Sequence, residues 1–170
     1  AAPSAGAETG AARRLGPYVV EASLARGGMG EVLLAFDPGL NRRVAIKTIA
    51  RALLDEPGVV ERFRREARAT AAVAHPAIAG IYYVGADEEG LPFIAMEYID
   101  GVSLYQVIRD RMAVPYSTLC DWMIQTCEGL QAAQKADIIH RDLKPANLMI
   151  TRKGEVKIVD FGLAKIFRED

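Results

Sequence analysis

The chain has 170 residues, of which 51% are hydrophobic and 25% are charged, and its formal net charge is −1. These are ordinary values for one globular domain with a hydrophobic core. A net charge so close to zero excludes an overall field that would attract nucleic acid or an anionic membrane, so we expect no nucleic-acid partner.

No apolar run approaches the ~20 residues that a membrane-spanning helix requires, so we expect no membrane segment in this chain. The first residues also lack the apolar stretch of a signal peptide. The two cysteines, Cys120 and Cys127, have neither metal-binding nor redox spacing. We interpret them as half-buried small side chains, which fits a reducing, cytoplasmic compartment.

Residues 1–16 are mostly Ala, Gly, Ser and Pro, and this composition predicts a disordered leader. Order is expected from Tyr18 onward. Strand-like runs over residues 18–24 and 32–36 meet at a glycine cluster and predict a hairpin. Residues 43–49 predict a third strand.

The hydrophobic period then changes to that of a helix over residues 59–74, and Pro76 marks its end. Residues 81–86 and 91–98 predict two more strands, separated by an Asp-Glu-Glu-Gly turn. Residues 17–99 therefore read as a first lobe with five strands and one helix.

Residues 100–170 begin with two predicted helices, 104–111 and 118–136. Two short strands follow, 148–151 and 155–159, joined by a Lys-Gly turn. The second helix is expected to present one apolar face, made by Leu119, Met123, Cys127 and Leu130.

The tip of the first hairpin is rich in glycine: Gly27, Gly28 and Gly30 lie between Arg26 and Val32. Glycines at such a tip let backbone N–H groups close over a phosphate chain with no Cβ in the way. An ordinary turn explains the same residues, so this cluster by itself leaves both interpretations open.

Lys47 ends an apolar strand, where it is either an edge residue with its stem on apolar surface or a phosphate-binding lysine. A phosphate-binding lysine needs a carboxylate to hold it. Glu66 is the best candidate, because it lies in mid-helix beside Phe63 and Ala67 on the inward face. Glu61 is the competitor, but it lies in the first turn, where the helix dipole already accounts for an acidic residue.

The run from His140 to Asn147, His-Arg-Asp-Leu-Lys-Pro-Ala-Asn, resembles the catalytic loop of a protein kinase. Asp160-Phe161-Gly162 then matches the magnesium-binding motif of the same family. With the glycine loop and the lysine strand, the chain resembles a eukaryotic-like (Hanks-type) protein Ser/Thr kinase from about Tyr18 to Ala164. The Gly-Gly-Met-Gly loop is similar to that of bacterial members.

This resemblance implies an α+β, two-lobe protein-kinase-like fold. Residues 17–99 are expected to form an N-lobe with a five-stranded antiparallel sheet and one helix. Residues 100–170 are expected to form the first part of a mainly helical C-lobe that is incomplete, because the chain stops soon after the magnesium motif. We therefore expect the rest of that lobe, or a partner chain, to cover the truncated face, and the chain alone to be inactive.

The resemblance also implies the reaction, transfer of the γ-phosphate of ATP to Ser or Thr hydroxyls of a protein substrate with the help of Mg²⁺. It assigns orientation of the hydroxyl and acceptance of its proton to Asp142, and stabilisation of the transferred phosphoryl group to Lys144. Asn147 and Asp160 are the implied magnesium ligands, since both offer hard oxygen atoms. A lysine two residues after the catalytic aspartate is the Ser/Thr-kinase form.

The remaining nucleotide contacts are implied by position. Lys47, held by Glu66, is expected to bind the α- and β-phosphates, and Met96 is at the gatekeeper position. The carbonyl of Glu97 and the N–H of Ile99 are expected to meet the adenine edge. The full set of expected nucleotide-binding residues is Gly27, Gly28, Gly30, Val32, Ala45, Lys47, Glu66, Met96, Glu97, Ile99 and Met149.

Two alternatives to an active kinase stay open: a nucleotide-binding pseudokinase that works as a regulatory or scaffolding module, and a structural remnant that binds nothing. The intact Lys47, Asp142, Asn147 and Asp160 favour activity. Ala25 favours the alternatives, because it occupies the first glycine position of the loop.

Overall fold

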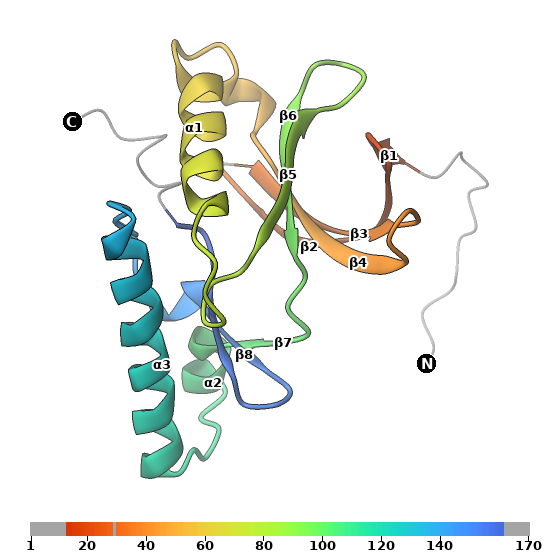
Figure 1. Ribbon diagram of the computed structural model, residues 1–170. Coiled ribbons are helices and arrows are strands. Elements are labelled where there is room, and N and C mark those ends of the chain that lie inside the picture. The colour runs from red at the N-terminus through yellow and green to blue at the C-terminus, as the bar shows by residue number, and fades with distance from the viewer. Residues whose placement is uncertain (1–12, 29, 162–170) are drawn as a thin grey trace, which may run out of the picture.

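The computed structural model describes residues 13–28 and 30–161, which form two antiparallel sheets and three α-helices (Figure 1). The strands are β1 (Arg14–Leu15), β2 (Tyr18–Gly27), β3 (Gly30–Asp37), β4 (Arg42–Thr48), β5 (Ile81–Ala86), β6 (Pro92–Glu97), β7 (Gly101–Ser103), β8 (Leu148–Thr151) and β9 (Val156–Ile158). The helices are α1 (Val59–Ala71), α2 (Leu104–Arg109) and α3 (Tyr116–Lys135), with short 3₁₀ turns at η1 (Arg51–Leu53) and η2 (Pro145–Asn147).

The larger sheet has six strands in the order β1-β2-β3-β4-β6-β5, one more than the five expected. The additional strand is β1, in which Leu15 pairs with Tyr18 and is only 3% exposed. The prediction of a disordered leader through residue 16 is therefore wrong for these residues, because a short strand gains its order from pairing rather than from composition. Residues 1–12 of the predicted leader lie outside the described residues.

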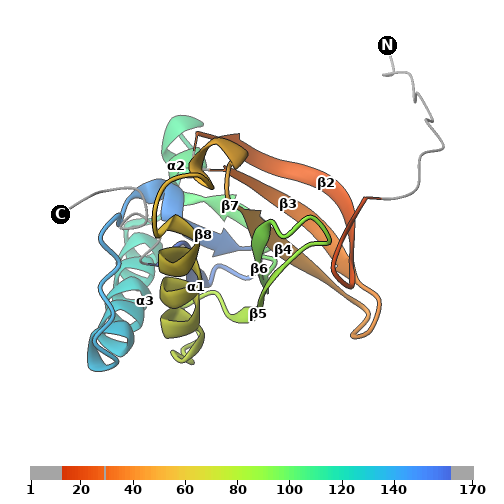
Figure 2. The ribbon, with the colours of Figure 1, turned by 90° about the horizontal axis from the view of Figure 1, so that it is seen from above.

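Helix α1 packs beside β5 and β6 at the edge of this sheet (Figures 1 and 2). Its buried stripe is Val59, Phe63, Ala67 and Thr70, which recurs at the helical spacing that the sequence predicts. The helix ends at Ala71, three residues earlier than expected.

The smaller sheet, in the order β7-β8-β9, packs against α2 and α3 in the lower half of Figure 1. The strand β7 was not predicted. Helix α2 begins with a capping box, in which Ser103 and Gln106 exchange hydrogen bonds with each other's backbone N–H groups.

The predicted apolar face of α3 is wrong for three of its four residues: Leu119, Met123 and Cys127 are exposed, and Leu130 packs against the core. The buried residues of the helix are Trp122, Thr126, Gly129 and Ala133. The Trp122 indole N–H donates to the carbonyl oxygen of Gly154 at 2.9 Å. Gly129 lies so close to Ile158 and Ala77 that a Cβ there would crowd both. Packing against the β8–β9 hairpin therefore selects this face over the more hydrophobic one.

The two sheets meet along the segment that precedes β5. Ile78 forms an isolated parallel bridge with Ile158 of β9, and Ala79 N–H donates to the Ile158 carbonyl oxygen at 3.0 Å. Residues 159–161 leave β9 beside this junction, so the magnesium motif expected from the sequence begins between the two halves of the molecule.

Candidate active site

The catalytic segment predicted from the sequence lies between α3 and β8 and is anchored by His140, which is 4% exposed. The N–H of Asp142 donates to Nδ1 of His140 at 3.3 Å, so Nδ1 is an acceptor and the ring hydrogen is on Nε2. Nε2 then donates to the carbonyl oxygen of Val159 at 2.9 Å. The same ring packs against Phe161 with the centroids 4.7 Å apart. His140 therefore connects the catalytic segment to the residues after β9.

Asp142, Lys144 and Asn147, three of the expected site residues, form one polar cluster. Lys144 Nζ lies 2.6 Å from Asp142 Oδ2, and Asn147 Nδ2 donates to the Asp142 carbonyl oxygen at 2.8 Å. The hydrogen bond from Lys144 lowers the pKa of the Asp142 carboxyl below its ordinary value, with smaller contributions from Asn147 and His140 and against the effect of burial. Asp142 is thus held as a carboxylate.

Lys47 and Asp160 form an ion pair, with Nζ and Oδ1 2.8 Å apart. The sequence predicts that Lys47 pairs with Glu66. In the part of the chain that the structure describes, Glu66 instead forms an ion pair with its neighbour Arg65, at 3.4 Å. The expected pairing is therefore not the one in this structure. The backbone of Asp160 is left-handed, with φ of 63°, and its carboxylate satisfies the Lys47 ammonium at direct contact distance.

The segment 97–100, which connects β6 to β7, is called the hinge below. A cavity of about 310 Å³, the hinge cavity, opens between it and the two sheets, and six of the expected nucleotide-binding residues line it: Val32, Ala45, Met96, Glu97, Ile99 and Met149. Asp160 lines it too. The remaining lining residues are Ala25, already placed in the glycine loop by its sequence position, and six that were not predicted: Leu24, Tyr98, Ser103, Gln106, Ala146 and Val159. Ser103 and Gln106 belong to an unpredicted strand and a helix start, so only their proximity in the fold reveals them.

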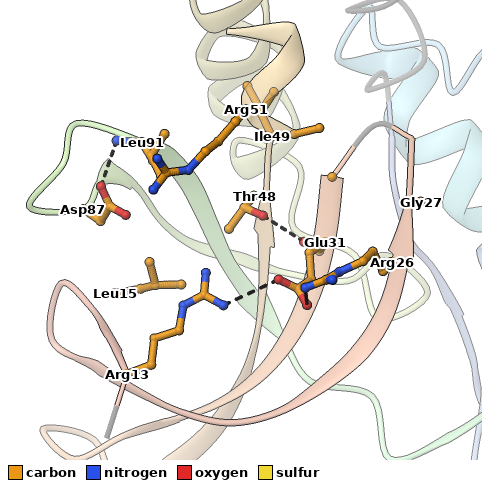
Figure 3. Close-up of a pocket in the computed structure, with 12 residues that line it drawn as sticks. Arg13, Leu15, Arg26, Gly27, Glu31, Thr48, Ile49, Arg51, Asp87 and Leu91 are labelled. Carbon is orange, nitrogen blue, oxygen red and sulfur yellow. Dashed lines mark hydrogen bonds and ion pairs between the residues drawn. The ribbon is translucent and has the colours of Figure 1, made fainter. Parts of the chain in front are cut away.

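The glycines at the hairpin tip do not line the hinge cavity with the other expected residues. Gly27 and Gly30 line a separate cavity of about 370 Å³, together with Arg13 and Glu31 (Figure 3). This cavity is the larger one, but none of the residues expected to act in catalysis, to bind phosphate as a lysine or to bind metal lines it. Gly28 is exposed and lines neither cavity.

The backbone conformation at residue 30 requires a glycine. Its φ is 146°, a conformation that other residues rarely adopt, and a Cβ there would overlap the carbonyl oxygen of Thr48. At Gly27 and Gly28, by contrast, a Cβ would meet open space.

Asn147 and Asp160 fit a magnesium ion chemically. The side-chain nitrogen of Asn147 is used as a donor to Asp142, which leaves its amide oxygen as the atom available to a cation. The Val159 N–H donates to the Asn147 carbonyl oxygen at 3.0 Å, which holds Asn147 beside the residue that precedes Asp160. A carboxylate and an amide oxygen are the hard ligands that Mg²⁺ prefers.

The chain matches the protein kinase domain family over residues 18–170. The probable serine/threonine-protein kinase SCO3848 of Streptomyces coelicolor is 44% identical over 158 residues, which cover 90% of this chain and 23% of that protein. The serine/threonine-protein kinase PknA of Mycobacterium tuberculosis is 40% identical, over 88% of this chain and 36% of that protein. The crystal structure of the M. tuberculosis PknI kinase domain superposes with a TM-score of 0.76 at 29% identity, over 89% of this chain and 61% of that domain.

This chain belongs to the protein kinase family. The family, the kinase fold and the similarity to bacterial members, all predicted from sequence motifs, are thereby confirmed. The chain spans only 23% and 36% of the two named relatives' lengths. No helix within residues 13–28 and 30–161 is both long and apolar enough to cross a membrane.

Proposed function

We propose that this protein is an ATP-dependent serine/threonine kinase that transfers the γ-phosphate to hydroxyl groups of a protein substrate. One observation carries the proposal: Asp160 both lines the hinge cavity and contacts Lys47, and it follows directly on Val159, which is hydrogen-bonded to the catalytic segment. The proposed nucleotide site therefore adjoins the segment that carries Asp142, the proposed proton acceptor.

Asp142 is the proposed acceptor of the hydroxyl proton. A carboxylate with a lowered pKa is a weak base, so its main contribution is to orient the hydroxyl and to accept the proton late, as phosphoryl transfer requires. Lys144, whose ammonium lies against this carboxylate, stabilises charge on the transferred group. A lysine in this position supports Ser and Thr as the target residues.

Asn147 and Asp160 are the proposed metal ligands, and Mg²⁺ bound there neutralises charge on the phosphate oxygens. Lys47 is proposed to bind the α- and β-phosphates, with Glu66 as its partner when nucleotide is bound. Gly27, Gly28 and Gly30 are proposed to cover the phosphates. The backbone of Glu97 and Ile99 meets the adenine edge, while Val32, Ala45, Met96 and Met149 enclose the base.

The proposed partner is a protein substrate that carries Ser or Thr. We also propose a cytoplasmic location, which the free thiols of Cys120 and Cys127 support.

The test is a titration of the full-length protein with a fluorescent ATP analogue, with and without Mg²⁺, followed by a phosphate-transfer assay. Lys47→Ala and Asp160→Asn are expected to weaken magnesium-dependent binding. Asp142→Asn should spare binding and reduce transfer by about 10²-fold or more, since general-base groups contribute this much. Its control is Asp121→Asn, an exposed carboxylate on α3. Equal affinity in wild type, Lys47→Ala and Asp160→Asn, or phosphotyrosine as the main product, contradicts the proposal.

A further inference from the structure

The side chains of Glu97 and Lys157 meet across the junction of the two sheets. Glu97 is the last residue of β6 in the larger sheet, and Lys157 is the middle residue of β9 in the smaller one. The Lys157 ammonium lies 2.8 Å from Oε1 and 2.9 Å from Oε2 of Glu97, so it contacts both carboxylate oxygens.

This ion pair is partly withdrawn from solvent, with side-chain exposures of 27% for Glu97 and 17% for Lys157. Most exposed ion pairs contribute little, because two flexible side chains must be ordered in water to form them. Here the Glu97 carboxylate also accepts a hydrogen bond from the Gly80 N–H at 3.2 Å, and the Glu97 N–H donates to the Gly80 carbonyl oxygen at 2.8 Å. Glu97 is therefore fixed through both its backbone and its side chain.

The strand that carries Lys157 is also fixed by hydrogen bonds. Its neighbour Ile158 donates its N–H to the Ala77 carbonyl oxygen at 2.8 Å and accepts from the Ala79 N–H at 3.0 Å. The segment before β5, the end of β6 and β9 thus form one hydrogen-bonded unit. The Glu97–Lys157 ion pair is a side-chain link within this unit between the end of β6 and β9.

The two residues belong to the strands that lead to the two ends of the proposed nucleotide site. Glu97 lines the hinge cavity, where its backbone is proposed to meet adenine. Lys157 does not line that cavity, but it precedes the proposed magnesium ligand Asp160 by three residues. The ion pair therefore joins the strand that ends at the adenine end of the site to the strand that leads to its metal end.

We propose that Glu97 and Lys157 form an interlobe latch that sets the spacing between these two ends, and that Lys157 is a positioning residue for bound nucleotide although it lies outside the cavity. The proposal rests on the nucleotide-binding function proposed above. A ligand that spans both ends of the site, such as Mg-ATP, depends on the latch. Adenosine occupies only the adenine end and does not depend on it.

The experiment compares the dissociation constants of Mg-ATP and adenosine for full-length wild type, Lys157→Met, Lys157→Gln and Lys157→Arg. Met keeps the aliphatic stem and removes the ammonium, so Lys157→Met should bind Mg-ATP about tenfold more weakly and adenosine within about twofold of wild type. Lys157→Gln should bind Mg-ATP with an affinity between those of Lys157→Met and wild type, because its amide still donates a hydrogen bond. Lys157→Arg should restore Mg-ATP binding. The matched control is Lys153→Met, an exposed lysine in the turn of the same hairpin.

The outcomes separate this proposal from the proposed function. A wild-type protein that binds no Mg-ATP contradicts the function itself. Wild-type binding that Lys157→Met leaves within about twofold overturns the latch alone. An equal loss of Mg-ATP and adenosine binding also overturns it, because that pattern indicates general destabilisation of the fold. If Lys157→Met does not fold, as judged by thermal unfolding, the comparison of Lys157→Gln with Lys157→Arg decides the question in the same way.

Discussion

Lys47 of β4 and Asp160 after β9 are in direct contact, with 2.8 Å between the ammonium and the carboxylate. A proposed phosphate-binding lysine and a proposed metal ligand therefore neutralise each other in this structure, while Glu66 on α1 is paired with Arg65. Lys47 has to exchange Asp160 for Glu66 if it is to bind phosphate while Asp160 binds a metal ion.

Glu66→Gln tests this exchange. We expect kcat/KM for ATP to fall by at least about tenfold, because the neutral amide cannot hold the Lys47 ammonium, while thermal stability changes little. The control is Glu61→Gln in the first turn of the same helix. Identical kinetics for the two variants would mean that Lys47 acts without Glu66.

Lys144→Met should raise the pKa of Asp142, because the hydrogen bond from Lys144 is the main cause of its lowered value. A carboxyl with a lower pKa in the folded protein stabilises the fold above its unfolded pKa, and that contribution is lost as the pH falls through the folded value. In the variant, the Asp142 carboxyl should therefore titrate at higher pH, which NMR measures from the chemical shift of its side-chain carboxyl carbon. Lys135→Met, an exposed lysine on α3, should leave the titration unchanged. A titration curve that does not move in Lys144→Met would rule out this lysine as the cause.

Gly30→Ala should be much more harmful than Gly28→Ala. The added Cβ at Gly30 overlaps the Thr48 carbonyl oxygen at an unfavourable φ, whereas at Gly28 it meets open space. We expect a loss of about 1–3 kcal/mol in the free energy of unfolding for the first variant, and about 0.5 kcal/mol or less for the second. Chemical denaturation measures both, and similar losses would show that the hairpin adapts to either side chain.

Ala25→Gly should change nucleotide affinity less than tenfold, or about 1.4 kcal/mol. Ala25 lies in β2 opposite Val32 and lines the hinge cavity, so its methyl group adjoins the proposed base site rather than the glycine tip. Titration with the fluorescent ATP analogue measures the effect, and Ala22→Gly in the same strand serves as the control. A gain larger than tenfold would make Ala25 an inhibitory residue and favour a pseudokinase.

Local sequence patterns predicted most of the elements, because alternation, helical period and turn residues act within a few positions. Strands β5 and β8 and the buried stripe of α1 follow the sequence closely. Strands β1 and β7 were not predicted, because each is only a few residues long and forms by pairing, β1 with the neighbouring strand β2 and β7 with the distant strand β8. The buried face of α3 was not predicted for a related reason: the Trp122 hydrogen bond and the tight approach at Gly129 depend on the β8–β9 hairpin.

The candidate site was likewise predicted only in part. Motif spacing identified Asp142, Lys144 and Asn147, and the structure brings these three together. The partner of Lys47 could not be predicted, because a sequence does not say which of two nearby carboxylates a flexible side chain contacts. The same holds for Glu97 and Lys157, which are 60 residues apart in the chain.

The imidazole of His140 has a use as a spectroscopic reporter. Both of its nitrogens are engaged, Nδ1 as acceptor from Asp142 and Nε2 as donor to Val159, and the Phe161 ring lies against it. Its ¹⁵N chemical shifts therefore encode the tautomer, and its ring protons feel the Phe161 ring current. If the segment after β9 separates from the catalytic segment, both signals change together. One buried histidine thus makes the docking of two functional segments observable without any added ligand or label on the substrate.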